Sequence, residues 1–289
     1  MKKIIPLLGL FIICSTNAAA QSVSVGVRGG VSIPNLSTNT DNPVSEGYSS
    51  RLAGDAAVFV NIRFSDLFSI QPMLEFSQQG GKRNGRQAFP VDGMVEGIKN
   101  NADLPEGIDI KDILKNQILG GSEYIYLDTD SEAKLNYLLL PVLAKFSWNL
   151  GPKTKNHFSF YADVGPFLGY LLSAHQEYSK TKPGLYDSKD AEETIKVGGV
   201  PIENLIAQFV GEDFDITDEI DGQQDIRSDL YRWNVGISGN IGFAYHFARS
   251  AIFIEGGGNY GFINIQKDTQ NGKNHTGAAT VSLGYSYKL

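Results

Sequence analysis

The sequence is nearly free of cysteine and has no long hydrophobic run outside its N-terminus. The single cysteine, Cys14, lies in a segment that we expect to be removed, which excludes disulfides, thiolate metal sites and a cysteine nucleophile from the mature chain. After residue 20 no stretch approaches about eighteen consecutive apolar residues, so no transmembrane helix is predicted. Tryptophan (2) and methionine (3) are rare, whereas glycine (32), phenylalanine (16) and tyrosine (13) are frequent. Glycine and aromatic residues spread along extended segments are typical of a β-barrel.

Basic clusters are also missing. The net charge is −7, and no stripe of lysine and arginine interleaved with aromatic residues occurs, which argues against nucleic-acid binding. Residues 175–229 contain fourteen acidic and five basic residues, so this segment, at −9, more than accounts for the net charge. The acidic surface predicted there favours a basic or cation-bridged partner.

The first twenty residues have the pattern of a secretory signal peptide. Lys2 and Lys3 precede an apolar run over Ile4–Ile13, and Ala18–Ala20 offers a small-residue cleavage site before Gln21. The run is too short for a membrane-spanning helix. A lipoprotein signal is disfavoured because Ile13 stands before Cys14, where a small residue would be needed. We therefore predict a signal peptide at 1–20 and one barrel domain at 21–289.

The remaining chain alternates between apolar and polar residues in eight stretches. These predict strands of period two: Ser22–Val31, Arg51–Phe64, Phe68–Gly80, Leu135–Trp148, His157–Ala174, Asp229–Phe247, Ala251–Ile263 and Gly277–Leu289. The connections are alternately short and long, and two of them, 81–134 and 175–228, exceed fifty residues. Short periplasmic turns and long extracellular loops are typical of outer-membrane barrels. The predicted fold is all-β: an eight-stranded antiparallel transmembrane β-barrel in the cell outer membrane, with both termini in the periplasm.

Sorting each strand by parity separates its apolar residues from its charges. One face carries residues such as Val58, Leu140 and Ile241, and we expect it to contact outer-membrane lipid. The other face carries nine charges, which we predict form a network in the lumen: Arg28, Asp55, Arg63, Glu75, Lys145, Asp163, Arg232, Glu255 and Lys288. Buried charges persist when they are paired and hydrogen-bonded, so five basic and four acidic residues predict an ion-paired plug.

A soluble lipocalin-type barrel would place the apolar face inside instead. The aromatic residues at the strand ends, the long loops at one end and the lack of disulfides favour the membrane barrel. Pro72, Pro141 and Pro166 lie inside predicted strands of a barrel that has no edge, so we expect a β-bulge at each.

No catalytic, cofactor or metal site is predicted. His157, His175, His246 and His275 stand in no recognisable nucleophile motif, so the chain is predicted not to be an enzyme. The acidic segment Glu212–Glu219 lacks the spacing of a calcium loop, which leaves weak surface calcium binding or a solvated acidic loop as the two interpretations.

Each of the two longest loops contains apolar residues at helical spacing. Residues 109–119 and 201–210 predict short amphipathic helices. Two interpretations remain open: the helices cover the barrel mouth as a lid, or they form a docking surface for a partner.

Six segments carry a resemblance to a known family: SVSVGVRGGVSIPNLS, FSIQPMLEFSQQGGK, LNYLLLPVLAKFSW, FYADVGPFLGYLL, IFIEGGGNYGFINI and VSLGYSYKL. The chain resembles the PorT-like outer-membrane β-barrel proteins, often described as the porin family or by their outer-membrane β-barrel domain. The resemblance covers nearly all strand residues and neither long loop. It implies a structural or interaction role at the cell surface, accessory to protein secretion or assembly. Because loops on a rigid scaffold are where binding residues mostly lie, we expect a surface or secretion-machinery protein to bind through the two long loops. The alternative function is a narrow, porin-like channel for small solutes.

Overall fold

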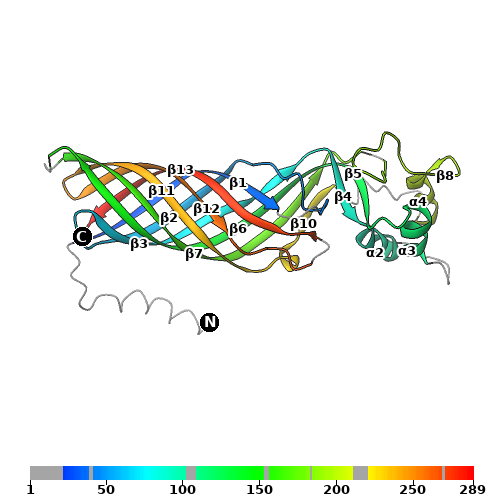
Figure 1. Ribbon diagram of the computed structural model, residues 1–289, viewed down its shortest axis with the longest axis horizontal. Coiled ribbons are helices and arrows are strands. Elements are labelled where there is room, and N and C mark those ends of the chain that lie inside the picture. Colours follow the sequence, from blue (N-terminus) through cyan, green and yellow to red (C-terminus); the bar gives the residue numbers. More distant parts are fainter. Residues whose placement is uncertain are drawn as a thin grey trace, which may run out of the picture.

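Eight long antiparallel strands close a barrel in the computed structural model, which describes residues 22–38, 42–101, 109–152, 156–182, 184–210, 221–268 and 271–289 (Figure 1). The strands are β1 (Ser22–Thr38), β2 (Ala53–Arg63), β3 (Phe68–Arg83), β6 (Asp130–Leu150), β7 (Asn156–Ser179), β11 (Trp233–Phe247), β12 (Ser250–Gly261) and β13 (Asn274–Lys288). Each strand pairs with the next of these in the chain, and β13 pairs with β1. The predicted eight-stranded barrel is confirmed. The predicted signal peptide, residues 1–20, lies outside the described residues.

The two faces of the barrel wall have opposite polarity, as predicted. Ile241 on β11 is 60% exposed on the outside, whereas Glu75 on β3 is 2% exposed on the inside. Other exposed outward side chains include Val27, Val58, Val142, Val164, Ile254 and Leu283. Because side chains alternate along a strand, a register slip by one residue would turn the charges toward lipid. Register is therefore strongly specified in every strand.

Aromatic side chains form belts around both ends of the exposed apolar band. Near the short turns, Trp148 stacks on Phe160 with ring centroids 5.7 Å apart, and Phe160 contacts Phe243 at 5.2 Å. Toward the long loops, Tyr170 meets Trp233 edge-on at 4.9 Å. Such girdles mark the membrane–water interfaces of outer-membrane barrels.

The predicted bulges at the prolines are wrong. Pro72 pairs with Val142, Pro141 with Phe167 and Pro166 with Ile237, and the register is the same on both sides of each proline. The prolines gather in the neighbouring strands β3, β6 and β7, so the ladder loses individual hydrogen bonds there without inserting a residue. The register shift between β6 and β7 falls instead beside Asn136 and Tyr137.

β6 and β7 continue well past the membrane, further than predicted. They have 21 and 24 residues, whereas about 9–11 residues cross a bilayer. In this extension the polarity of the wall inverts. Outward residues become polar, as at Glu132 and Lys134, and the inward ones form an apolar cluster: Leu36, Ala133, Leu135, Tyr137, Leu139, Phe167, Leu171, Ala174, Leu230 and Ile265. The prediction ended these strands early because the outward apolar pattern stops where lipid stops.

Beyond the extended strands, the two longest loops build a small cap (Figure 1). The first loop contributes β4 (Arg86–Pro90), α2 (Val91–Asn101), α3 (Ile110–Asp112), the π-helical turn η2 (Ile113–Ile118) and β5 (Tyr124–Asp128). The second contributes β8 (Lys196–Val197), β9 (Val200–Pro201) and α4 (Ile202–Val210). Its later part returns to the barrel, where β10 (Gly222–Asp225) pairs with β7 and is followed by the 3₁₀ turn η3 (Arg227–Asp229).

The predicted helical segments at 109–119 and 201–210 are confirmed, whereas α2 was not predicted. Its apolar residues Val91, Val95 and Ile98 lie at helical spacing, but Gly93 and Gly97 weaken the pattern. None of the helices in the described ranges is long and apolar enough to cross a membrane.

Candidate functional site

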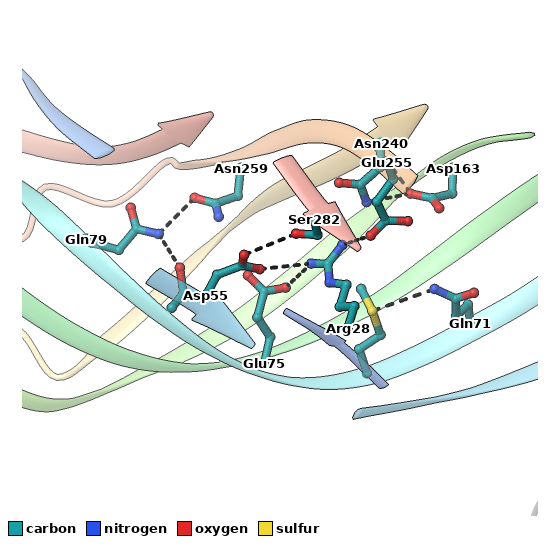
Figure 2. Close-up of polar contacts among 12 residues, drawn as sticks. Arg28, Asp55, Gln71, Glu75, Gln79, Asp163, Asn240, Glu255, Asn259 and Ser282 are labelled. Carbon is teal, nitrogen blue, oxygen red and sulfur yellow. Dashed lines mark hydrogen bonds and ion pairs between the residues drawn. The ribbon is translucent and has the colours of Figure 1, made fainter. Parts of the chain in front are cut away.

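The centre of the lumen is occupied by one arginine held between three carboxylates (Figure 2). Arg28 on β1 places Nη2 2.6 Å from Glu75 Oε2 on β3 and 3.9 Å from Asp55 Oδ2 on β2. Its Nη1 donates to Glu255 Oε1 on β12. All four side chains are buried, which places these ion pairs in a low-dielectric environment, out of contact with solvent.

Neutral side chains extend this network around the barrel. The Tyr161 hydroxyl donates to Glu255 Oε2 at 2.6 Å, and the Ser282 hydroxyl donates to Asp55 Oδ1 at 3.1 Å. These contacts satisfy carboxylate oxygens that the single guanidinium does not reach. A buried charge retains its ionised form only where such partners are present.

A second layer lies next to the first. Asp163 on β7 accepts hydrogen bonds from the backbone amide and the side chain of Asn240 at 3.1 and 2.8 Å. Lys145 Nζ on β6 donates to Gln71 Oε1 at 3.2 Å and lies 3.6 Å from the centroid of the Tyr161 ring. The two layers together draw a side chain from each of the eight strands: Arg28, Asp55, Gln71, Glu75, Lys145, Tyr161, Asp163, Asn240, Glu255 and Ser282.

The structure brings six of the nine predicted lumen charges into these two layers, namely Arg28, Asp55, Glu75, Lys145, Asp163 and Glu255. Arg63 and Lys288 lie at the end of the barrel with the short turns. Arg232 precedes β11, is exposed and donates to the Tyr170 hydroxyl at 3.3 Å, so its assignment to the lumen is wrong. The layers therefore hold two basic and four acidic residues.

The neutral side chains that hydrogen-bond to these charges were not predicted, because only charged residues were sorted by strand face. The inward parity of Gln71, Tyr161, Asn240 and Ser282 was a usable signal, because polar residues on the lumen face of a narrow barrel must find partners there. Their pairing across strands depends on barrel stagger, which a strand list does not contain.

A cavity of about 280 Å³ opens at the short-turn end and ends against Lys145 and Tyr161. Inside it, Ser159 Oγ and His246 Nε2 are 2.8 Å apart, and the His246 ring stacks on His157 with centroids 4.6 Å apart. A serine nucleophile needs a histidine base that a carboxylate orients. No aspartate or glutamate lines this cavity within the described ranges, so the pair lacks that third group.

The cap has its own hydrophobic core, to which both long loops contribute. The first loop supplies Val91, Val95, Ile98, Ile110, Leu114, Leu119, Ile125 and Leu127, and the second supplies Leu185, Ile202 and Ile206. Two backbone hydrogen bonds of 2.9 Å join Tyr126 to Tyr186 across the loops. The loops therefore form one folded unit.

Arg86 on β4 makes several polar contacts between the loops. Its guanidinium lies 3.5 Å from the centroid of the Tyr186 ring, and it donates to the carbonyl oxygens of Lys189 and Ala191. It also pairs with Asp128 at 3.5 Å. One first-loop side chain thus holds the start of the second loop.

We expect Arg86→Ala to lower the free energy of local opening of the cap by about 2 kcal/mol, because the desolvated cation–π contact is lost. Hydrogen exchange followed by mass spectrometry should then accelerate over residues 184–195 and remain unchanged in the barrel strands. Lys99→Ala, on the exposed face of α2, removes a charge without this contact and serves as the control. Unaltered exchange over residues 184–195 in Arg86→Ala would show that the contacts of Arg86 do not stabilise the second loop.

Within the described part of the chain, no group of three or more histidine, cysteine, aspartate or glutamate residues could hold a metal ion. The acidic segment Glu212–Glu219 lies outside the described residues, so its calcium interpretation remains a prediction.

A match to a known protein family agrees with the fold. The family described as "Outer membrane protein beta-barrel domain" matches residues 19–267. Three solved structures are among those similar to this chain. Ail of Yersinia pestis is 9% identical, with 92% of this chain and 100% of that chain covered and a TM-score of 0.33, and OprG of Pseudomonas aeruginosa is 8% identical, with 94% and 98% of the two chains covered and a TM-score of 0.34. Neisserial surface protein A is 8% identical, with 94% of this chain and 100% of that chain covered and a TM-score of 0.33. No curated protein sequence matches the chain.

Proposed function

Because the chain belongs to the outer membrane protein beta-barrel domain family, we propose that this outer-membrane protein is a closed, non-enzymatic barrel whose two-loop cap acts as an interaction module at the cell surface. One observation carries the proposal: two loops far apart in the sequence share a single hydrophobic core beyond the barrel. A loop that only closes a mouth does not need a core of its own. Binding residues are disproportionately found on loops that a rigid scaffold positions.

The lumen offers little space for a passing solute. The Arg28 network crosses its centre, and an apolar cluster fills the extension beyond it. An eight-stranded barrel is just wide enough for its own side chains. The barrel therefore serves as a scaffold in this proposal. The cavity of about 280 Å³ at the short-turn end favours a narrow channel as the second candidate, but the cavity ends at Lys145 and Tyr161.

The charge of the second loop indicates the chemistry of the partner. Its residues 175–229 carry −9, and carboxylates such as Asp187, Asp190 and Glu193 are exposed. Long loops of outer-membrane barrels lie outside the cell. A basic or cation-bridged partner fits this surface, and its association should weaken as salt rises. The resemblance to the PorT-like family supports a secretion or surface-assembly protein as that partner.

The experiment removes the cap and keeps the barrel. Arg83 is paired with Ser131 and Tyr178 with Gly222, so residues 84–129 and 180–221 can each be replaced by a short Asn-Gly turn between strands that are already adjacent. We expect the shortened protein to insert and to migrate heat-modifiably, yet to fail to complement a deletion strain. Lys99→Ala, which leaves the cap core intact, is the control that should complement. Full complementation by the shortened protein would place the function in the barrel.

The non-enzymatic assignment has its own test at Ser159. We expect a fluorophosphonate probe to leave this serine unlabelled, because none of the described residues that line the cavity offers a carboxylate to orient His246 as a base. Mass spectrometry of the tryptic peptide after incubation with the probe measures this directly, and Ser159→Ala gives the background. Covalent labelling of Ser159 above that background would identify an activated nucleophile.

A further inference from the structure

The cavity at the short-turn end has a strongly one-sided charge. Four cationic side chains line it, and within the described ranges no carboxylate does. They are Arg63, Lys145, Arg249 and Lys288, and the histidines His157 and His246 lie among them. A chain with a net charge of −7 would not concentrate basic groups in one recess by its overall composition. The arrangement therefore requires a local explanation.

Lys145 forms the inner end of this cavity, and among the residues that the structure describes no carboxylate oxygen is paired with its Nζ. Its Nζ contacts Gln71 Oε1 at 3.2 Å and the face of the Tyr161 ring at 3.6 Å, both of which are neutral. Asp163 is its register partner across β6 and β7, but Asp163 accepts its hydrogen bonds from Asn240. The Tyr161 hydroxyl is engaged with Glu255, so the ring stands between Lys145 and the Arg28 network. Lys145 is thus left with hydrogen-bonding capacity toward the cavity.

The mouth of the cavity adds further donors. Arg249 lies in the turn between β11 and β12, where its carbonyl oxygen accepts from the Lys288 amide at 2.7 Å. Arg63 stands at the end of β2. Serine hydroxyls from several strands complete the lining: Ser22, Ser24, Ser147, Ser159, Ser250 and Ser286. Arg249 and Lys288 are exposed and can turn toward a ligand at the mouth, whereas the charge of Lys145, deeper in the cavity, is the one that an anion would stabilise most.

We propose that this cavity binds a small oxyanion bearing a phosphate group, taken from the periplasm. Lysine and arginine are the usual phosphate-binding side chains, and hydroxyl donors can complete a tetrahedral oxyanion's shell. A volume of about 280 Å³ is at the low end of ligand pockets, which suits a small ligand and excludes a folded partner. The mouth lies at the end with the short turns, which is the periplasmic end of an outer-membrane barrel.

The test uses the full-length protein in zwitterionic detergent and inorganic phosphate as the probe. Equilibrium dialysis measures phosphate binding at constant ionic strength, with chloride as the competing anion, so that screening is the same throughout. We expect saturable binding that Lys145→Gln and Arg249→Gln each weaken about tenfold, since each loses one charge-assisted contact. Lys189→Gln, an exposed residue of the cap, removes the same charge far from the cavity and should bind as the wild type does.

Heat-modifiable migration of each variant shows that the barrel is folded before binding is measured. Equal binding by the wild type and both cavity variants would overturn the proposal, as would equal weakening in Lys189→Gln. A second arm replaces free phosphate with micelles containing phosphatidylglycerol. Binding of the lipid without any binding of inorganic phosphate would also overturn it, because the ligand would then be a membrane headgroup.

Discussion

Replacing Arg28 with methionine is expected to destabilise the barrel by about 3–5 kcal/mol, the cost of breaking a buried ion pair from one side. The substitution leaves Asp55, Glu75 and Glu255 without their shared cation in a buried space. Urea unfolding of the protein refolded into detergent micelles or lipid vesicles measures the loss. Arg227→Met, at a half-buried arginine of the 3₁₀ turn η3 outside the lumen, should change the free energy of unfolding by less than about 0.5 kcal/mol.

A charge-balanced variant separates electrostatics from packing. Adding Glu75→Gln and Glu255→Gln to Arg28→Met removes two of the stranded carboxylates and should recover part of the stability, because buried neutral groups cost less than buried unpaired charges. A barrel that loses nothing in Arg28→Met, or a triple variant no more stable than the single one, would contradict the role assigned to this network.

The second large effect is expected on the outer wall. Ile241→Arg places a charge in the middle of β11, where the side chain is 60% exposed on the lipid-facing side. An arginine near the bilayer midplane costs about 2–4 kcal/mol and much less near the interface. Urea unfolding in vesicles should therefore show a loss of that size.

Leu67→Arg is the matched control for this substitution, because Leu67 is exposed in the turn between β2 and β3, outside the lipid. We expect it to cost less than about 1 kcal/mol. If both substitutions cost the same, Ile241 does not face lipid, and the wall would be oriented as in a soluble barrel.

The strands of the membrane zone were predictable because lipid imposes a strict rule. On β11 and β12, outward residues such as Ile241 and Ile254 alternate with inward Asn240 and Glu255, and the pattern runs the length of the strand. Each exception would expose a charge to lipid, so the alternation is preserved. The number of strands, their order and the sidedness of Glu75 and Glu255 follow from it.

The rule stops applying where the wall leaves the membrane. In the extension of β6, Glu132 and Lys134 face outward while Ala133 and Leu135 pack inside, which inverts the pattern that identified the strand.

The bulges predicted at the three prolines are wrong for a different reason. A proline removes one hydrogen bond but need not insert a residue, so Pro72 stays in register.

The lumen contacts could be predicted only in part. Parity placed Arg28 and Glu75 on the inner face, but which charges meet depends on the stagger of the closed sheet. Arg232 was assigned to the lumen because the predicted strand begins at Asp229. In the structure β11 begins at Trp233, so Arg232 precedes the strand and the alternation of faces does not apply to it. The shared core of the cap joins Leu127 to Leu185 through tertiary packing, and local periodicity carries no information about such pairs.

Planar-bilayer conductance of the purified full-length protein tests most directly the claim that this barrel is a closed scaffold. The Arg28 network and the apolar cluster above it close the lumen beyond the short-turn cavity, so we expect no large, stable conductance steps at neutral pH. Arg28→Met serves as a comparison, because loss of the central ion pairs should raise the frequency of brief openings. Large and stable steps from the wild-type protein would contradict the account and establish a channel.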